Sequence, residues 1–301
     1  MYCALCNHSQ LTSVATKDAK TGAPLAIRLC RSCGLIQQNP LPTEQQLSDY
    51  YATSYRIDYK GTWHPKPKHI HRAARCAASR LQQLAKSGVR GGTLLDIGAG
   101  GGEFVALARQ SGFDACGIEP NQGYAEYARM EYQVPVTTAG LDEVTGRYGI
   151  ITLFHVLEHL RLPLEVFERL HSLLEPDGVL FIEVPWALSG AIAPSNRYFK
   201  AHLYYFDVRT LTACASRHFE VFQTSVDGNL RMLLRPRPVV APLALPPPDY
   251  VASLPALLRR HGWIHYLTHG RGFTKLFRKA SRWWEESRVQ DLPGRKILKN
   301  T

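Results

Sequence analysis

Apolar and polar positions follow two different periods along the middle of the chain. From His69 to Ser87, apolar residues recur every three or four positions, which is typical of an amphipathic helix that ends before Gly88. After this helix, short apolar runs alternate with further helical segments. The predicted strands are Thr93–Ile97, Ala115–Ile118, Val134–Thr138, Ile150–Phe154 and Val179–Val184, and the predicted helices are Gly102–Gln110, Gly123–Glu131 and Pro163–Leu174. This alternation predicts an α/β protein with a mostly parallel sheet and helices on both faces.

The pattern changes towards the end of the sheet. Phe219–Val226 and Leu230–Leu234 are two strand-like runs joined by Asp227-Gly228-Asn229, and Asp-Gly between apolar runs indicates a β-hairpin. Asp177-Gly178 is expected to turn the chain into the strand that follows it. The sequence therefore predicts a parallel sheet that is closed by an antiparallel hairpin.

The first 37 residues have a different character. Cys3 and Cys6 form one C-x-x-C pair, Cys30 and Cys33 form a second, and a polar turn lies between them at 16–24. Two such pairs, 23 residues apart, are typical of a tetrahedral Zn²⁺ site. A site closed by four thiolates has no open position, so we expect a structural zinc ribbon. Because the seven cysteines are an odd number and no secretory signal is expected at the start, we also expect a reducing cytoplasm.

A glycine-rich segment follows the first predicted strand of the sheet. Asp96 lies in the strand, and Gly98, Ala99, Gly100 and Gly102 form a loop that leads into a helix. Such a loop lets the backbone approach a ligand closely. The dinucleotide-binding fingerprint requires Gly or Ala at position 103, where this chain has glutamate.

At this point the sequence resembles the class I S-adenosylmethionine-dependent methyltransferases. Their first motif is similar to the stretch LLDIGAGGGEF at 94–104, their second to Gly117–Asn121, and a later segment of the ubiquinone-type enzymes to Leu153–Leu160. The resemblance covers roughly residues 70–235 and includes the terminal hairpin. It implies a Rossmann-like methyltransferase domain at 69–235, after a connector at 38–68.

The resemblance also implies a role for individual residues. Gly98, Ala99, Gly100 and Gly102 would surround the methionine part of S-adenosylmethionine, and Asp96 would anchor their loop. Glu119 would accept the ribose hydroxyls. The remaining cofactor contacts would come from Pro120 and Asn121 beside the adenine, Leu141 at its edge, and Phe154 and His155 below the sulfonium.

His155, Glu158 and His159 are spaced so that a helical turn would present them on one side. In one interpretation, His155 or His159 is a general base for an attacking hydroxyl. In a second, the group binds a divalent metal, as similar constellations do in some ubiquinone-pathway and small-RNA methyltransferases. His202 is expected to complete either arrangement. In a third, Glu158 and His159 only cap a helix.

The charge of the chain is concentrated at one end. The formal net charge is +11, and residues 256–301 alone carry 11 Lys/Arg against 3 Asp/Glu. The nearly neutral remainder argues against a nucleic-acid partner. Residues 236–301 are expected to form a Pro-rich linker and a basic amphipathic helix from Arg271 to Trp284. This helix is compatible with binding to an anionic surface at the inner face of the membrane. It is equally compatible with packing on this protein or on a second subunit.

These observations predict a cytoplasmic methyltransferase with a small-molecule or glycan acceptor. The segment Cys33–Pro40, followed by Tyr50-Tyr51, resembles methyltransferases of bacterial surface-polysaccharide clusters and favours a sugar hydroxyl or carbon. O-methylation of a quinone- or polyketide-like molecule is a second interpretation. A third is a scaffold that binds the cofactor without catalysis. The sequence has no apolar run long enough for a transmembrane helix.

Overall fold

The computed structural model describes residues 2–49, 65–260, 262–268, 272 and 274–301. The chain divides into two compact units, which are described separately. Unit 1 comprises 1–43, 154–172 and 179–275, and unit 2 comprises 44–153, 173–178 and 276–301. The tyrosine-rich part of the predicted connector, at 50–59, and the first residues of the predicted tail helix, Arg271 and Phe273, lie outside the described residues.

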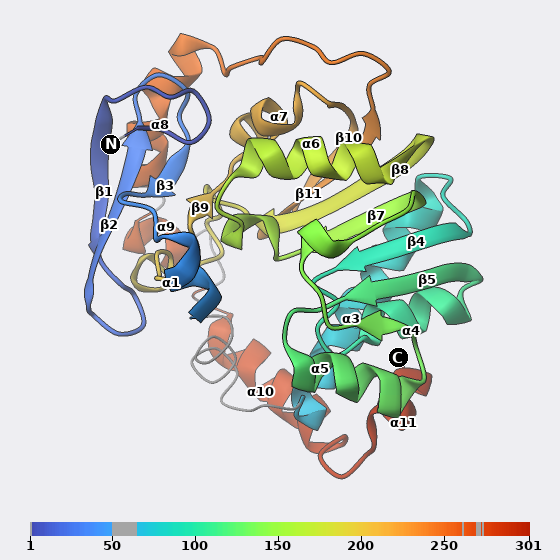
Figure 1. The fold of residues 1–301 in the computed structure, drawn as a ribbon. Helices are drawn as coiled ribbons and strands as arrows, with labels where there is room; N and C mark the ends of the chain where they lie inside the picture. The colour runs from blue at the N-terminus through green and yellow to red at the C-terminus, as the bar shows by residue number, and fades with distance from the viewer. Residues whose placement is uncertain (1, 50–64, 261, 269–271, 273) are drawn as a thin grey trace. The chain divides into compact units, whose positions relative to one another are not determined.

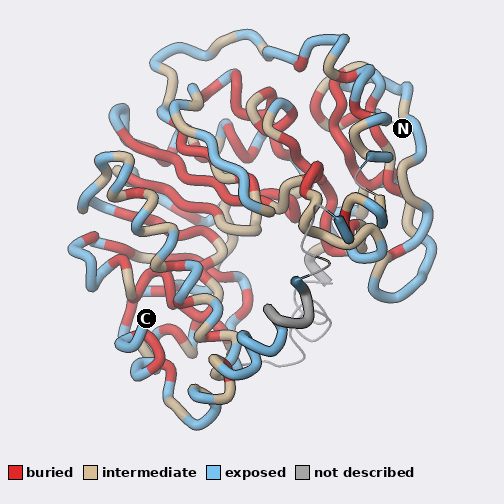
Figure 2. Tube along the Cα trace, turned by 180° about the vertical axis from the view of Figure 1, so that it is seen from behind, coloured by how far each residue is buried: buried red, intermediate tan, exposed pale blue. Residues whose placement is uncertain are grey.

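Unit 2 contains a parallel sheet of buried strands, β4 (Gly92–Ile97), β5 (Phe113–Ile118), β6 (Val136–Thr137) and most of β7 (Tyr148–Phe154) (Figure 1). In its register, Ile97 pairs with Ile118 on one side and with Leu153 on the other. The loops that follow these strands therefore leave from the same edge of the sheet. The middle parts of β4, β5 and β7 are buried (Figure 2), which explains why the sequence shows them as apolar runs.

Helices α3 (Pro67–Lys86), α4 (Glu103–Gln110) and α5 (Gln122–Tyr127) belong to this unit, and a π-helical turn, Ala128–Tyr132, continues α5. The helix that the apolar period predicts at 69–87 is confirmed as α3. Its buried side is made of Ile70, Ala74, Ala77 and Leu84.

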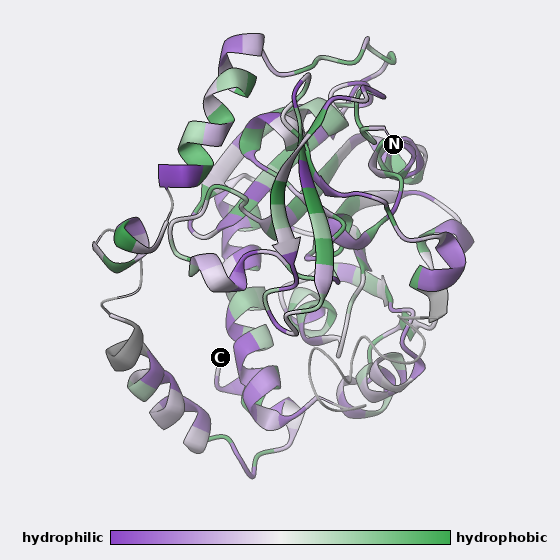
Figure 3. Cartoon of the chain, turned by 90° about the vertical axis from the view of Figure 1, so that its left-hand side faces the viewer, coloured by the Kyte–Doolittle hydropathy of each residue, from purple (hydrophilic) through white to green (hydrophobic). Residues whose placement is uncertain are grey.

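Unit 1 contains the cysteine pairs. Their sheet consists of β1 (Leu11–Lys17), β2 (Pro24–Cys30), β3 (Ile36–Gln38) and a short strand from much later in the chain, β9 (Tyr204–Tyr205). β9 pairs with β3 through Tyr205 opposite Ile36 and Tyr204 opposite Gln37. Hydrophobic and hydrophilic residues are mixed along β1 and β2 (Figure 3), since one face of this small sheet packs inward and the other is exposed.

The predicted terminal hairpin is confirmed as β10 (Phe219–Val226) and β11 (Asn229–Pro236), with Gly228 at a φ of 98° in the turn. The strand before it, β8 (Leu174–Pro185), pairs antiparallel with β11. The seven-stranded sheet has the order β10-β11-β8-β7-β4-β5-β6. This order confirms a mostly parallel α/β sheet with an antiparallel hairpin at its end.

One predicted boundary is wrong. β8 begins at Leu174 instead of Val179, so Asp177 and Gly178 lie within the strand and not in a turn before it. Gly178 is nevertheless required by a close approach, because a Cβ there would lie 2.6 Å from Leu174 Cγ and 2.9 Å from the Glu175 carbonyl oxygen.

The remaining helices are α1 (Glu44–Asp49), α6 (Pro163–Leu173), α7 (Val208–Ala215), α8 (Pro248–Arg260), α9 (Trp263–Thr268), α10 (Lys275–Ser287) and α11 (Gly294–Lys299). Helix α10 corresponds to the predicted tail helix. In unit 2, Glu286 of α10 pairs with Arg72 of α3, whereas Trp283 and Trp284 stay 69% and 58% exposed. None of the helices in the described ranges has both the length and the apolar character that crossing a bilayer requires.

Candidate active site

The glycine loop, residues 98–102, follows β4 in unit 2. Its three key glycines have left-handed φ angles, 75° at Gly98, 57° at Gly100 and 83° at Gly102. Side chains with a Cβ are strained in this region, so the sequence GAGGG allows a path that most others do not. At Gly102 a Cβ would also lie only 2.6 Å from Ala128 Cβ, because α4 begins directly against the π-helical turn.

Backbone hydrogen bonds fix this loop to the end of β5. The N–H groups of Gly98 and Ala99 both donate to the Ile118 carbonyl, each at 2.9 Å. The Gly100 N–H donates to Glu119 Oε2, also at 2.9 Å. A Cβ on Gly100 would meet no described atom within 4 Å, so there is open space beside this part of the loop.

Glu119 is only 3% exposed and is held at both oxygens. Its Oε1 accepts the Asn121 N–H at 3.1 Å, and Asn121 in turn caps α5 by accepting the Tyr124 N–H at 3.0 Å. Each carboxylate oxygen has two lone pairs, so these bonds leave Glu119 able to accept further hydroxyl donors. The carboxylate, the loop and the space beside Gly100 suit a nucleoside ligand.

Asp96 lies in β4 immediately before the loop, buried and opposite Thr152 of β7. The Thr152 hydroxyl donates to Asp96 Oδ1 at 2.6 Å. Burial raises the pKa of Asp96 to about 7, although this hydrogen bond opposes the shift. The sequence gives no local signal for Thr152, which is 56 residues away and becomes a neighbour only through strand pairing.

The other predicted cofactor residues are divided between the units. In unit 2, Asn121 is buried, Leu141 begins a short 3₁₀ turn and is half-buried, and Pro120 is exposed. Phe154 and His155 belong to unit 1, where the Phe154 ring packs edge-on against Phe181 at 5.1 Å.

Unit 1 brings together the four residues of the histidine–glutamate cluster, His155, Glu158, His159 and His202. A 3₁₀ turn, Leu157–His159, carries two of them. The ring nitrogen closest to Glu158 Oε1 is at 3.5 Å for His155, 3.8 Å for His159 and 3.8 Å for His202. Ligand atoms of Glu158, His159 and His202 all lie within 4.8 Å of one another.

Glu158 is 1% exposed, and neither of its carboxylate oxygens has a hydrogen-bond partner among the described residues. Burial disfavours its charged form, but the three surrounding imidazoles outweigh this and lower the pKa of Glu158 to about 2. A buried carboxylate without hydrogen bonds is costly. The helix-cap interpretation would require a backbone N–H bond to Glu158, but its oxygens accept none from a described residue. Their position among imidazole nitrogens is typical of a cation site.

The two buried histidines of the cluster turn their Nε2 atoms towards Glu158. His159 Nδ1 donates to the Ala201 carbonyl at 2.7 Å, so its proton is on Nδ1 and Nε2 faces Glu158. Burial and the nearby His159 lower the pKa of His202 to about 3, which keeps this ring neutral. Neutral imidazole nitrogens and a carboxylate oxygen are common ligands for divalent transition metals.

His155 differs from the other histidines. It has a left-handed φ of 58°, and its Nε2 lies 3.0 Å from Glu183 Oε1 on β8. Burial disfavours its charged form, but the carboxylates of Glu158 and Glu183 prevail and raise the pKa of His155 to about 9. Glu183 also accepts hydrogen bonds from Asn229 and Arg231 of β11. No local sequence pattern indicates Glu183, Asn229 or Arg231, because the β8–β11 pairing brings the latter two to Glu183 only in the folded chain.

The segment that carries His202 is fixed to the sheet of the four-cysteine unit. Asp18 Oδ2 accepts the Lys200 N–H at 2.6 Å, and Gln38 Nε2 donates to the Lys200 carbonyl at 3.1 Å. On the other side of His202, the Leu203 N–H donates to the Glu158 carbonyl at 2.8 Å. The four-cysteine unit therefore helps to place His202 next to Glu158.

The predicted zinc ligands also come together. Cys3 and Cys33 have their sulfur atoms 3.5 Å apart, and Cys6 and Cys30 likewise. All four ligand atoms lie within 4.8 Å of one another. Since Zn–S bonds are about 2.3 Å long, four thiolates at such distances fit a tetrahedral ion.

Comparison with known proteins defines the class of this protein. A family model described as a methyltransferase domain matches residues 69–222, half of the chain, and the chain belongs to this family. Its sheet is the Rossmann-like fold of methyltransferases, as the sequence predicts.

Individual relatives have low sequence identity to the chain and match only part of it. The chain is 27% identical to a ubiquinone biosynthesis O-methyltransferase of Pseudomonas paraeruginosa over 106 residues, which are 32% of this chain and 46% of the relative. It is 30% identical to the enzyme of that name from Bordetella avium over 131 residues, 40% of this chain and 54% of the relative. The chain thus spans about half the length of these curated relatives.

Among solved structures, the chain is similar to magnesium protoporphyrin IX methyltransferase from Synechocystis PCC 6803. The sequence identity is 17% and the TM-score is 0.48, and the match covers 65% of this chain and 99% of that one. The chain is also similar to the PH0226 protein of Pyrococcus horikoshii, with 14% identity and a TM-score of 0.47, over 65% of this chain and 100% of that one.

Proposed function

We propose that this protein is an S-adenosylmethionine-dependent methyltransferase that binds its cofactor on the glycine loop and Glu119. The observation that carries the proposal is the hydrogen bond from the Gly100 N–H to the Glu119 carboxylate, which fixes the loop and the acid as one site. Gly98, Ala99, Gly100 and Gly102 would adjoin the methionine part, with Asp96 behind them. Glu119 would accept the ribose hydroxyls, with Pro120, Asn121 and Leu141 around the adenine.

The cofactor supplies a methyl group that its sulfonium already activates. The protein therefore has to align the acceptor with this methyl group and to exclude water, and such orientation can contribute about 7–11 kcal/mol to catalysis. A nucleophilic side chain is not needed for this reaction. A scaffold that binds the cofactor without catalysis would have the same arrangement at the glycine loop and Glu119, so a methyl-transfer assay with labelled cofactor distinguishes it from the enzyme.

We further propose that Glu158, His159 and His202 bind a divalent cation that holds the acceptor hydroxyl. Both Glu158 oxygens lack hydrogen bonds within the described structure, and the Nε2 atoms of His159 and His202 face them. A bound cation would lower the pKa of a coordinated hydroxyl. The base interpretation is weaker for His155, because a pKa of about 9 leaves it protonated at neutral pH. In this proposal His155 orients Glu158.

The acceptor that we propose is a phenolic hydroxyl of a quinone-like small molecule. Relatives named ubiquinone biosynthesis O-methyltransferase support it, although over only a third to two fifths of this chain. The sugar or glycan acceptor predicted from the cysteine unit has no counterpart among these relatives. Both acceptors present a hydroxyl, so the metal proposal applies to either.

In the four-cysteine unit we propose a structural Zn²⁺ held by Cys3, Cys6, Cys30 and Cys33, which suits a protein of the reducing cytoplasm. The exposed Trp283 and Trp284 support a contact with an anionic membrane or with a second copy of the chain, as the tail sequence predicts. Co-sedimentation with anionic vesicles, compared between the full chain and Trp283→Ala/Trp284→Ala, tests the membrane contact. Equal sedimentation of the two proteins would exclude the membrane contact.

Isothermal titration of the full-length protein with S-adenosylmethionine tests the central proposal. We expect one site per chain, and methyl transfer from labelled cofactor to a catechol but not to a sugar nucleotide. Absence of cofactor binding would overturn the methyltransferase proposal. Transfer only to the sugar nucleotide would overturn the quinone-type acceptor and leave the cofactor site standing.

A further inference from the structure

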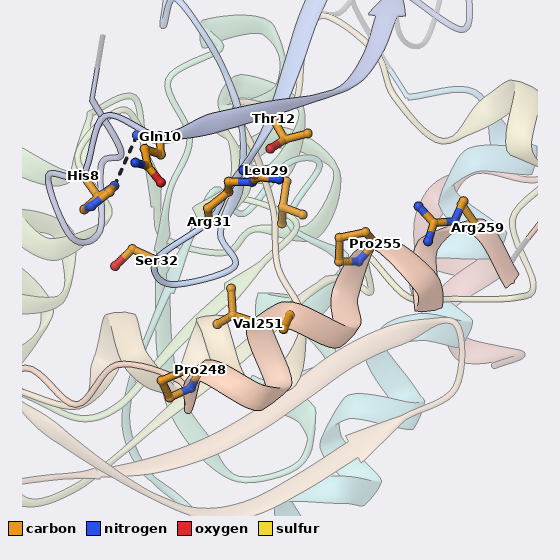
Figure 4. Close-up of a pocket in the computed structure, with 11 residues that line it drawn as sticks. His8, Gln10, Thr12, Leu29, Arg31, Ser32, Pro248, Val251, Pro255 and Arg259 are labelled. Atoms are coloured by element: carbon orange, nitrogen blue, oxygen red, sulfur yellow. Dashed lines mark hydrogen bonds between the residues drawn. The ribbon is translucent and has the colours of Figure 1, made fainter.

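The C-terminal region, residues 236–301, packs on the rest of the chain at two places. In unit 1, helix α8 lies against the four-cysteine unit, where Leu254 is buried in a core with Ile27. Figure 4 shows Val251 of α8 across a groove from Leu29 of that unit. The second place is in unit 2, where α10 and α11 pack on the two elements that lie beside the glycine loop.

Helix α10 is joined to the first half of α3 by ion pairs. Glu286 is only 9% exposed and accepts a hydrogen bond from Arg72 Nε at 2.5 Å, which lowers the pKa of this carboxyl below its usual value. Glu285 pairs with Arg75 and lies 3.9 Å from His71 Nε2. The three partners on α3 lie within about one helical turn, so two adjacent carboxylates hold one short stretch of this helix.

The start of α3 lies against the glycine loop. A Cβ on Gly101 would be 3.0 Å from Cγ of Pro65, which precedes the first residue of α3, Pro67, by two positions. The chain that enters α3 therefore sits directly on the backbone of the loop. Because α10 holds α3 between one and two turns after this point, the ion pairs also fix the contact between α3 and the loop.

Helix α11 packs on the other neighbour of the loop, the π-helical turn after α5. At Gly294, the first residue of α11, a Cβ would lie 2.5 Å from Tyr127 Oη and 2.6 Å from Tyr132 Oη. The backbone of α11 therefore rests on both tyrosine side chains. The Arg295 N–H also donates to Glu131 Oε1 at 2.8 Å, which ties the start of α11 to the turn.

The same π-helical turn touches the glycine loop at its other end, where a Cβ on Gly102 would lie only 2.6 Å from Ala128 Cβ. Both neighbours of the loop are thus held from outside by the end of the chain. We infer that residues 276–301 form a C-terminal clasp that fixes the glycine loop in the conformation that binds the cofactor, with Arg72 and Glu286 as positioning residues that act through α3. The inference rests on the proposed cofactor site.

Exchange of the two charges in the full-length protein tests the clasp by calorimetry with S-adenosylmethionine. Arg72→Glu and Glu286→Arg each place like charges side by side and should weaken binding by about tenfold. The double variant Arg72→Glu/Glu286→Arg restores an attractive pair and should bind within about twofold of wild type. Lys86→Glu is the matched control, because it makes the same reversal of charge at an exposed position in the last turn of α3, and it should leave the affinity unchanged.

Gly294→Ala tests the contact of α11. The backbone of Gly294 is not left-handed, so alanine would by itself favour the helix. Because the two tyrosine hydroxyls occupy the space of the new methyl group, we expect α11 to be displaced and cofactor binding to weaken by about fivefold. Unchanged or tighter binding would overturn the role of α11 in the clasp.

Hydrogen exchange at the amides of residues 98–102, measured without cofactor, gives a readout that does not depend on the proposed function. We expect faster exchange in Arg72→Glu and wild-type protection in the double variant. Wild-type affinity and exchange in Arg72→Glu, or a loss that the double variant does not reverse, would overturn the inference. A wild-type protein that fails to bind S-adenosylmethionine, but whose loop responds in this way, would refute only the proposed function.

Discussion

The glycine loop in unit 2 and the histidine–glutamate cluster in unit 1 are both buried polar sites, but they are completed to different degrees. In the first, Glu119 is bonded at each oxygen by a backbone N–H, and the loop is fixed to β5 without any ligand. In the second, Glu158 accepts no hydrogen bond from a described residue at either oxygen, and three imidazoles surround it at 3.5–3.8 Å. The first is a preformed cradle, whereas the second is a carboxylate held only among imidazole rings.

This difference indicates what each site does. A carboxylate that is fully held by the backbone is suited to recognise a ligand of fixed shape, because little has to reorganise when the ligand binds. A buried carboxylate whose oxygens accept no hydrogen bond from a described residue, beside two imidazole Nε2 atoms, has the donor set of a cation site. Four substitutions test this contrast.

Glu119→Ala should have the largest effect. It removes the ribose acceptor and also releases the Gly100 and Asn121 N–H groups, so we expect the affinity for S-adenosylmethionine to fall at least about 100-fold, or about 2.7 kcal/mol. Glu119→Gln retains one acceptor oxygen and should lose less. Calorimetry measures both, and unchanged affinity in Glu119→Ala would show that the cradle does not bind the cofactor.

Glu158→Gln should weaken both cation binding and stability. The variant should lose the divalent cation, because it lacks a charged ligand. Without that cation it should also be less stable than wild type at pH 7 by about 1–3 kcal/mol, because the imidazoles that lower the pKa of Glu158 to about 2 stabilise its charge in the folded state. Metal analysis and urea unfolding, at equal zinc content in the cysteine site, measure the two effects. A variant that keeps the cation would contradict the metal proposal.

Asp96→Asn should change how stability depends on pH. The pKa of Asp96 is about 7 in the folded protein and about 3.9 in an unfolded chain, so between these values the folded state holds a proton that the unfolded state has lost. Wild-type stability should therefore fall, as pH rises from 4 to 7, by up to about 1.4 kcal/mol per pH unit from this group. The variant keeps an acceptor for Thr152 and should lack this slope. Parallel unfolding curves for the two proteins would refute the burial argument.

Asp18→Ala should have the smallest effect, and it acts on the cluster at a distance. Loss of the bond to the Lys200 N–H should loosen the segment around His202 and weaken cation binding by about fivefold, near 1 kcal/mol. Zinc in the cysteine site and the affinity for S-adenosylmethionine should not change. Asp18→Asn keeps an acceptor and should restore much of the cation affinity, which a general loss of folding would not allow.

The local sequence was sufficient for the elements and for much of the glycine site. The strands β4, β5 and β7, the helix α3 and the β10–β11 hairpin follow from periodicity and turn residues, because each depends on neighbours within a few positions. The same holds for the loop at 98–102, whose glycines are needed for left-handed backbone angles. Glu119 could be predicted because the residue that follows the next parallel strand lies at the same edge of the sheet.

Other features arise only when distant segments meet. Thr152 reaches Asp96 through the register of two parallel strands. Asn229 and Arg231 reach Glu183 through the β8–β11 pair, and Glu183 in turn contacts His155. β9 joins the sheet of the cysteine unit from more than 160 residues away in the chain, and α8 packs on the same unit. Periodicity reports which face of an element is buried, but it does not identify the element that covers this face.

Residues close together in the sequence were thus enough to predict the methyltransferase family, the mostly parallel sheet, the backbone of the glycine loop and the candidate cysteine and histidine ligands. Two features appear only in the folded chain: Glu158 is buried with no hydrogen bond to a described residue, and His155 lies between two carboxylates. The cause is that backbone conformation is set by residues close in sequence, whereas burial and charge pairing depend on which distant surfaces come into contact.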